Sequence, residues 1–189
     1  MKGRKMTISS VFEITETASL PINPSKIANS LGIKVVSYKT FSDIYEIEQP
    51  SLYEKSAFGF TARIDNRFVI AVNENSCSER RKHFTVAHEL GHCVLGHKIG
   101  GIILPRDERA ADKFAAELLA PIPVLILCGA ESAAEIKKIC GISDKAAEIR
   151  FDELVRTRRK NFLISDENRR LAKIFADFIA RYRLGISRN

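Results

Sequence analysis

The sequence predicts an α+β protein, in which a small domain with a short mixed or antiparallel sheet and two main helices precedes a helical C-terminal region. Two observations support this fold class. Short segments rich in β-branched residues end before residue 74, and only helical patterns remain beyond about residue 121. We place the first domain at residues 1–125. The second region, residues 126–189, has a helix-turn-helix-like pattern and is expected to pack on the first.

Composition sets the class of protein. Hydrophobic residues make up 45% and charged residues 28%, enough apolar material for a buried core. The net charge of +7 favours an anionic partner such as nucleic acid, or serves solubility alone. Four cysteines without a CxxC pair predict reduced thiols. We recognise neither a signal peptide nor an apolar run long enough to span a bilayer, and we therefore expect a cytoplasmic protein without membrane contact.

The first predicted elements lie between residues 23 and 56. Asn23 can cap a helix, Pro24 suits its first position, and Gly32 ends it. Residues 33–38, "IKVVSY", read as a strand because of their β-branched valines. Residues 41–56 show no clear pattern, and we expect an irregular connection there.

A hairpin and a helix follow. Residues 56–65 and 67–73 read as two short strands joined at "IDN". Ser76 and Glu79 stand at capping-box spacing, and small or apolar residues then recur at helical intervals until Gly96. This pattern predicts a helix that lies on the sheet.

The remaining elements are helical. Residues 108–120, "ERAADKFAAELLA", form a helix that Asp107 can cap and Pro121 closes. Two helices about a turn at Gly141 follow, the first with a Ser132–Glu135 capping box. Residues 165–184 read as one last amphipathic helix.

The motif "HELGH" at residues 88–92 is the main functional signal. On a helix, His88 and His92 share one face and can bind one Zn²⁺ ion. Glu89 lies about 100° further round, where its carboxylate can contact a water at the site without being a ligand. Such a carboxylate is the base that metal-assisted peptide hydrolysis requires. The alternative is a chance motif of polar helix-surface residues.

His97 does not fit as a third ligand. A known three-histidine pattern, HExxHxxGxxH, places the last histidine six residues after the second. His97 comes five residues after His92, so we expect it near the site but not on the metal.

The next helix supplies a better third ligand. Glu108 and Asp112 are one turn apart and share the face that Ala115 and Leu119 continue. Glu117 lies about 180° from Glu108 and points away. We therefore expect Glu108 to be the third ligand and Asp112 to accept a hydrogen bond from a ligand histidine, unless Asp112 is simply solvated. Three protein ligands would leave the fourth position for water, as in catalytic zinc sites.

With these residues in place, the chain resembles the ImmA/IrrE-type metallopeptidases of the zincin group. The resemblance covers roughly residues 23–155. Its segments are "NPSKIANSLGIKVV", "RKHFTVAHELGHCVLGH", "ERAADKFAAELLAP" and "CGISDKAAEIRFDEL". The chain has Ala120 where the family usually has Met or Leu before the proline.

The resemblance implies a zincin-like fold and one Zn²⁺ ion held by His88, His92 and Glu108, with Glu89 as the catalytic carboxylate. Mn²⁺ or Fe²⁺ would suit the same ligands. The family resemblance further implies a cytoplasmic bacterial endopeptidase whose substrate is a helix-turn-helix transcriptional repressor. No residue for stabilising the oxyanion stands out, although Tyr45, Tyr53 and the arginines near 63–67 are candidates.

A different class of function is also open. The helical C-terminal region, with its basic run "RTRRK" at residues 156–160, could make the protein a non-catalytic regulator or a module that binds DNA or a repressor. We favour the peptidase, in which these helices form a cap with a solvated basic face. The sequence does not indicate an oligomeric state.

Overall fold

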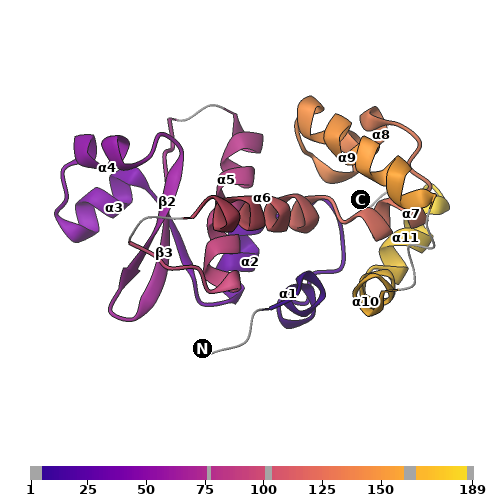
Figure 1. Cartoon of the computed structure of the whole chain (residues 1–189), viewed down its shortest axis with the longest axis horizontal. Coiled ribbons are helices and arrows are strands. Elements are labelled where there is room, and N and C mark those ends of the chain that lie inside the picture. Colours follow the sequence, from indigo (N-terminus) through magenta and orange to yellow (C-terminus); the bar gives the residue numbers. More distant parts are fainter. Residues whose placement is uncertain (1–5, 76–77, 101–103, 160–164, 187–189) are drawn as a thin grey trace. The chain divides into compact units, whose positions relative to one another are not determined.

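A computed structural model describes residues 6–75, 78–100, 104–159 and 165–186 (Figure 1). It confirms the α+β fold class, with three strands and eleven helices in the described residues. The chain divides into two compact units. The first contains Asn23–Ala115 and the second contains Thr7–Ile22 and residues 116–189. The domain boundary expected at residue 125 stays a prediction. Within the described residues, no helix combines the length and the apolar character needed to cross a bilayer.

A three-stranded mixed sheet lies at the centre of the first unit. Its strands are β1 (Lys34–Ser37), β2 (Gly59–Ile64) and β3 (Arg67–Val72), in the order β1-β3-β2. β1 runs parallel and β2 antiparallel to β3, with Thr61 opposite Ile70. The β2–β3 hairpin is therefore confirmed. Asp65 and Asn66 in its turn have φ angles of 47° and 64°, as a tight two-residue hairpin turn requires.

Two helices, α3 (Tyr38–Tyr45) and α4 (Gln49–Lys55), cover one face of the sheet. The expectation of an irregular connection at residues 41–56 was wrong. The Glu74 carboxylate, distant in sequence, accepts hydrogen bonds from the backbone N–H groups of Tyr38 and Lys39 and so stabilises the start of α3. A buried cluster joins these helices to the strands; it contains Tyr38, Phe41, Leu52, Phe60, Val69 and Ala71.

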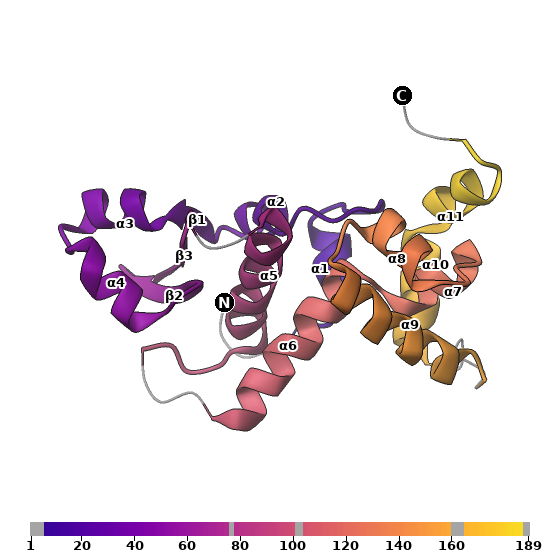
Figure 2. The same ribbon diagram turned by 90° about the horizontal axis from the view of Figure 1, so that it is seen from above.

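The helices α2 (Pro24–Ser30) and α5 (Glu79–Leu95) lie against the other face (Figures 1 and 2). α2 has the predicted Asn23 cap and Pro24 start. α5 ends at Gly96, whose φ of 70° suits a residue without a side chain. Ser78, rather than Ser76, caps its start by accepting a hydrogen bond from the Arg81 N–H; Ser76 lies outside the described residues.

α6 (Pro105–Leu119) begins three residues earlier than predicted. Pro105 occupies its first position, where the missing N–H costs nothing. Asp107 therefore lies inside the first turn, and its interpretation as the N-cap was wrong. α6 packs closely on α5, because a Cβ atom at Gly91 would come within 3.2 Å of Ala111 Cα and 3.1 Å of Phe114 Cδ1.

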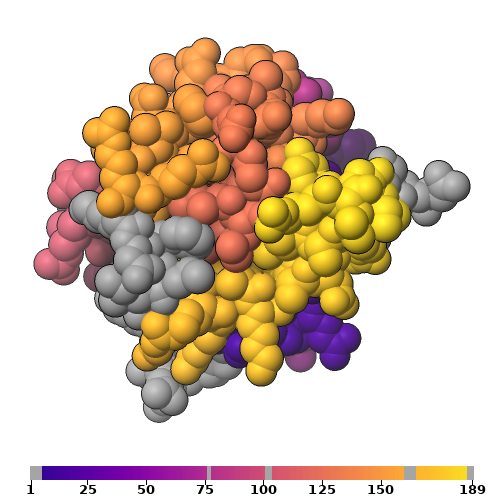
Figure 3. Space-filling view, turned by 90° about the vertical axis from the view of Figure 1, so that its right-hand side faces the viewer, coloured from indigo at the N-terminus to yellow at the C-terminus, as the bar shows by residue number. Residues whose placement is uncertain are grey.

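Six helices occupy the described part of the second unit. They are α1 (Ile8–Ile14), α7 (Ile122–Cys128), α8 (Ala133–Cys140), α9 (Asp144–Arg158), α10 (Asp166–Ile174) and α11 (Ala176–Arg183). Figure 3 shows a face of this unit on which the C-terminal helices (yellow) lie beside α7–α9 (orange). Fully buried Phe12 and Phe175 pack edge to face at 5.0 Å between ring centroids.

Two features of this unit differ from the sequence interpretation. α1 was not predicted; its start is held by Glu167, which accepts hydrogen bonds from the Ser9 N–H and hydroxyl. The last helix is divided at Phe175 into α10 and α11. The Ser132–Glu135 capping pattern is present at α8, although the Glu135 carboxylate reaches the N–H of Glu131.

Gly91→Val tests the close contact of α5 with α6. Valine is a better helix former than glycine by a few tenths of a kcal/mol, so helix propensity alone predicts a more stable protein. The contact predicts the opposite sign, a loss of about 1–3 kcal/mol from overpacking. Urea unfolding measures the sign directly. A variant as stable as the parent would contradict the close approach.

Candidate metal centre

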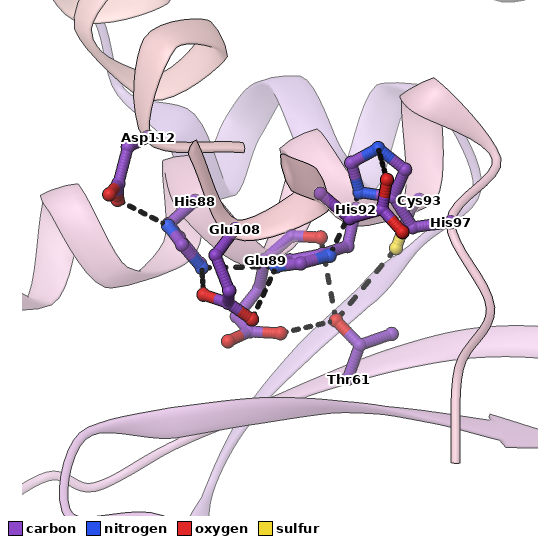
Figure 4. Close-up of polar contacts among 9 residues, drawn as sticks. Thr61, His88, Glu89, His92, Cys93, His97, Glu108 and Asp112 are labelled. Carbon is purple, nitrogen blue, oxygen red and sulfur yellow. Dashed lines mark hydrogen bonds and ion pairs between the residues drawn. The ribbon is translucent and has the colours of Figure 1, made fainter. Parts of the chain in front are cut away.

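Two histidines of α5 bring ring nitrogens together at the surface of the helix that faces α6. His88 and His92 are one turn apart, and their Nε2 atoms lie 3.0 Å from each other (Figure 4). Burial, followed by the nearby His88 and His97, lowers the pKa of His92 to about 4. The His92 imidazole is therefore neutral at pH 7, the form in which histidine binds metals.

Glu108, in the first turn of α6, approaches the same point. Its Oε2 atom is 3.3 Å from His88 Nε2, and its Oε1 atom is 3.7 Å from His92 Nε2. Ligands at about 2.0–2.1 Å from a tetrahedral Zn²⁺ ion lie about 3.3 Å apart, so these spacings fit such an ion. In the described part of the chain, His88, His92 and Glu108 are the one group of three or more such side chains that could hold a metal.

Asp112 lies behind His88, as its position one turn after Glu108 suggested. Its Oδ1 atom is 2.8 Å from His88 Nδ1. A carboxylate at that distance keeps the ring proton on Nδ1 and leaves the Nε2 lone pair for a cation. The Asp112 side chain is 60% exposed. It is therefore less buried than expected for a residue on the helix face that Ala115 and Leu119 continue.

Glu89 lies beside the three converging groups and points toward the sheet (Figure 4). Its Oε2 atom accepts a 2.8 Å hydrogen bond from the Thr61 hydroxyl on β2. Burial raises the pKa of the Glu89 carboxyl, while the hydrogen bond from Thr61 opposes that rise. A carboxyl with a raised pKa both accepts and returns protons more readily near neutral pH.

The sequence interpretation missed Thr61 and the contact made by His97. Thr61 faces α5 because side chains alternate along β2, and Phe60 faces the opposite cluster. His97 Nδ1 lies 3.0 Å from His92 Nδ1. Gly96 predicts the place of His97 just after the helix end, but no local pattern indicates that the ring turns back toward His92.

A cavity of about 830 Å³ opens over this group. Its lining includes His88, Glu89, His92, Glu108 and, at other points, Lys55 and Arg81. The earlier candidates for oxyanion stabilisation, Tyr45, Tyr53 and the arginines near 63–67, do not belong to the lining formed by the described residues. The cationic groups that reach this cavity therefore come from α4 and α5.

Comparison with known protein families gives a match. The model of a peptidase family described as the IrrE N-terminal-like domain matches residues 29–151, which is more than half of the chain. No curated protein and no solved structure matches the chain. The matched segment contains His88, Glu89, His92, Glu108 and Asp112.

Glu108→Ala should weaken metal retention, whereas Glu117→Ala on the same helix should not. The first change removes an oxygen donor, and we expect Zn²⁺ affinity to fall by more than the roughly 10- to 100-fold typical of losing an outer hydrogen-bond partner. Competition with a coloured chelator measures both dissociation constants. Equal weakening by the two changes would show that Glu108 is not a ligand.

Proposed function

The chain belongs to the peptidase family with an IrrE N-terminal-like domain, and we propose that it is a zinc-dependent endopeptidase that cleaves a helix-turn-helix transcriptional repressor. The family makes the protein a metallopeptidase that acts on protein substrates. The main support for a zinc-dependent endopeptidase is the convergence of His88, His92 and Glu108 beside the Glu89 carboxylate. The repressor as substrate rests on the family resemblance.

His88, His92 and Glu108 would hold the ion, and Glu89 would move the proton. A Zn²⁺ ion, when bound, polarises the scissile carbonyl and makes water more acidic. Glu89 takes a proton from the attacking water as the water oxygen bonds to the carbonyl carbon. As the C–N bond breaks, Glu89 gives that proton to the leaving nitrogen. Thr61 keeps the Glu89 side chain in place during both transfers.

β2 provides a place for an extended substrate. It is an edge strand of the sheet, and Gly59, Phe60 and Thr61 line the cavity above the metal group. An exposed edge can accept a peptide as an additional strand through backbone hydrogen bonds. A substrate bound in this way must be extended, so we expect cleavage in a loop or linker of the repressor and not within an intact helix.

Two cations in the cavity wall favour an acidic side chain in the substrate. Lys55 lies over the Phe60 ring at 4.3 Å and Arg81 over the Phe58 ring at 4.6 Å from the centroids. Among the described residues, neither forms an ion pair with a carboxylate. The carboxylates of the wall contact Thr61 or the histidines, which leaves the charges of Lys55 and Arg81 available to a substrate.

The alternative of a DNA-binding module has less support. Two arginines of α9 serve the second unit itself: Arg150 Nε donates to the Ala120 carbonyl at 3.0 Å, and Arg158 donates to the Ala130 carbonyl at 2.9 Å. Arg158 lies within the basic run that suggested nucleic-acid binding. Its hydrogen bond indicates a structural role, and the peptidase is the function we propose.

Glu89→Gln should keep the fold and the bound metal but abolish cleavage. The amide cannot accept the proton of water, and loss of a general base typically costs about 10²- to 10⁴-fold in rate. The measurement is the initial rate of cleavage of a candidate helix-turn-helix repressor, by mass spectrometry, with metal content determined in parallel. Cleavage at the parent rate would refute the role of Glu89. Glu89-dependent cleavage of an unfolded protein, without cleavage of the repressor, would refute only the proposed substrate.

Lys55→Glu with Arg81→Glu should reverse the preference of the enzyme among peptides. We expect the parent to cleave a peptide with glutamate beside the scissile bond faster than its lysine counterpart, and the double variant to do the opposite. The ratio of kcat/KM values for the two peptides measures the effect. Arg80→Glu, an exposed change outside the cavity lining, is the control, and the same reversal there would show that overall charge is responsible.

A further inference from the structure

The outer nitrogen of each candidate ligand histidine has a different kind of partner. A neutral imidazole that binds a cation through Nε2 carries its proton on Nδ1, which then needs an acceptor. His88 Nδ1 has the Asp112 carboxylate at 2.8 Å. His92 Nδ1 has another ring nitrogen, Nδ1 of His97, at 3.0 Å. The site therefore depends on which of these two Nδ1 atoms holds the proton between them.

The fold presents His97 for this contact. The left-handed residue Gly96 turns the chain at the end of α5, and the His97 N–H then donates to the His92 carbonyl at 3.0 Å. The two rings lie with centroids 5.0 Å apart and an angle of 71° between their planes. The His97 side chain is only 7% exposed, so water competes little for the bond between the rings.

The proton between His92 and His97 can lie on either Nδ1 atom, and the two arrangements have opposite effects on the ability of His92 to bind a cation. If His97 carries the proton on Nδ1, neutral His92 must carry its own on Nε2, where it points to His88 Nε2 at 3.0 Å and blocks the centre. If His92 carries the proton on Nδ1, its Nε2 lone pair faces the centre beside that of His88. Only the second pattern presents both lone pairs to a cation.

Asp107 favours the second pattern. Its Oδ1 atom lies 3.8 Å from His97 Nε2, so a proton on that nitrogen faces a carboxylate, whereas a lone pair there would face another acceptor. With the proton on Nε2, neutral His97 accepts from His92 through the lone pair on Nδ1. Asp107 and Glu108 are neighbours in the first turn of α6, so this turn supplies one ligand and one outer carboxylate.

We propose that His97, supported by Asp107, is a positioning residue that holds His92 in the tautomer able to bind the metal. His92 would thus be linked to a carboxylate through a second imidazole, while His88 is linked to one directly. The proposal rests on the metal site proposed above, and it assigns to His97 a role in metal affinity without contact with the ion.

Substitutions at His97 that differ in one property test the role. His97→Asn keeps an oxygen that can accept from His92 Nδ1–H, whereas His97→Leu has a similar size and no acceptor. We expect Zn²⁺ affinity to fall about 10- to 100-fold in the leucine variant and to be largely retained in the asparagine variant. Chelator competition measures both, and His83→Ala, which changes a histidine of α5 outside the metal group, should leave the affinity unaltered.

A second measurement reads the tautomer itself. Long-range ¹⁵N–¹H NMR of histidine-labelled protein with Zn²⁺ should place the proton of His92 on Nδ1 and that of His97 on Nε2. The reverse assignment, or equal affinity losses for His97→Asn and His97→Leu, would overturn the proposal. These results differ from failure of the metal site, in which the parent protein itself would not retain Zn²⁺.

Discussion

The close approach of α5 and α6 is the constraint on which the candidate site depends. Glu108 reaches the histidines only because the two helices meet where Gly91 leaves no side chain between them, against Ala111 and Phe114. Nothing in the HELGH motif itself supplies the third ligand, the Glu108 carboxylate. A wider spacing of the helices would leave His88 and His92 as two imidazoles without a carboxylate, and two ligands hold a divalent ion poorly.

The four acidic side chains around the candidate site have different partners. Glu108 approaches both Nε2 atoms, whereas Asp112 and Asp107 approach outer nitrogens of the imidazole cluster. Glu89 alone is turned toward the sheet, where burial raises its pKa and the Thr61 hydroxyl holds it. Carboxylates of similar intrinsic acidity thus meet different partners, and in the proposed mechanism they would act as ligand, orienting group or proton carrier for that reason.

The sequence could predict what local patterns determine. The helix caps at Asn23 and Gly96, the β2–β3 hairpin, and the shared faces of His88 with His92 and of Glu108 with Asp112 all follow from spacing along one segment. Three features that it missed have partners distant in the chain, although α1 and α3 also have local caps at Thr7 and Ser37. α3 begins where Glu74 accepts its first N–H groups, and α1 begins against Glu167. Thr61 acquires its role only when β2 is laid beside α5.

The pairing of β2 with β3 has a consequence for Glu89. Thr61 lies opposite Ile70 on the α5 side, and Phe60 lies in the aromatic cluster on the other side. A register slip of one residue would exchange these faces, burying a hydroxyl among rings and setting an apolar side chain against Glu89. The tight turn at Asp65 and Asn66 is remote from Glu89, but it sets the register that places Thr61 against the Glu89 carboxyl. The turn thereby limits how far burial raises the pKa of Glu89.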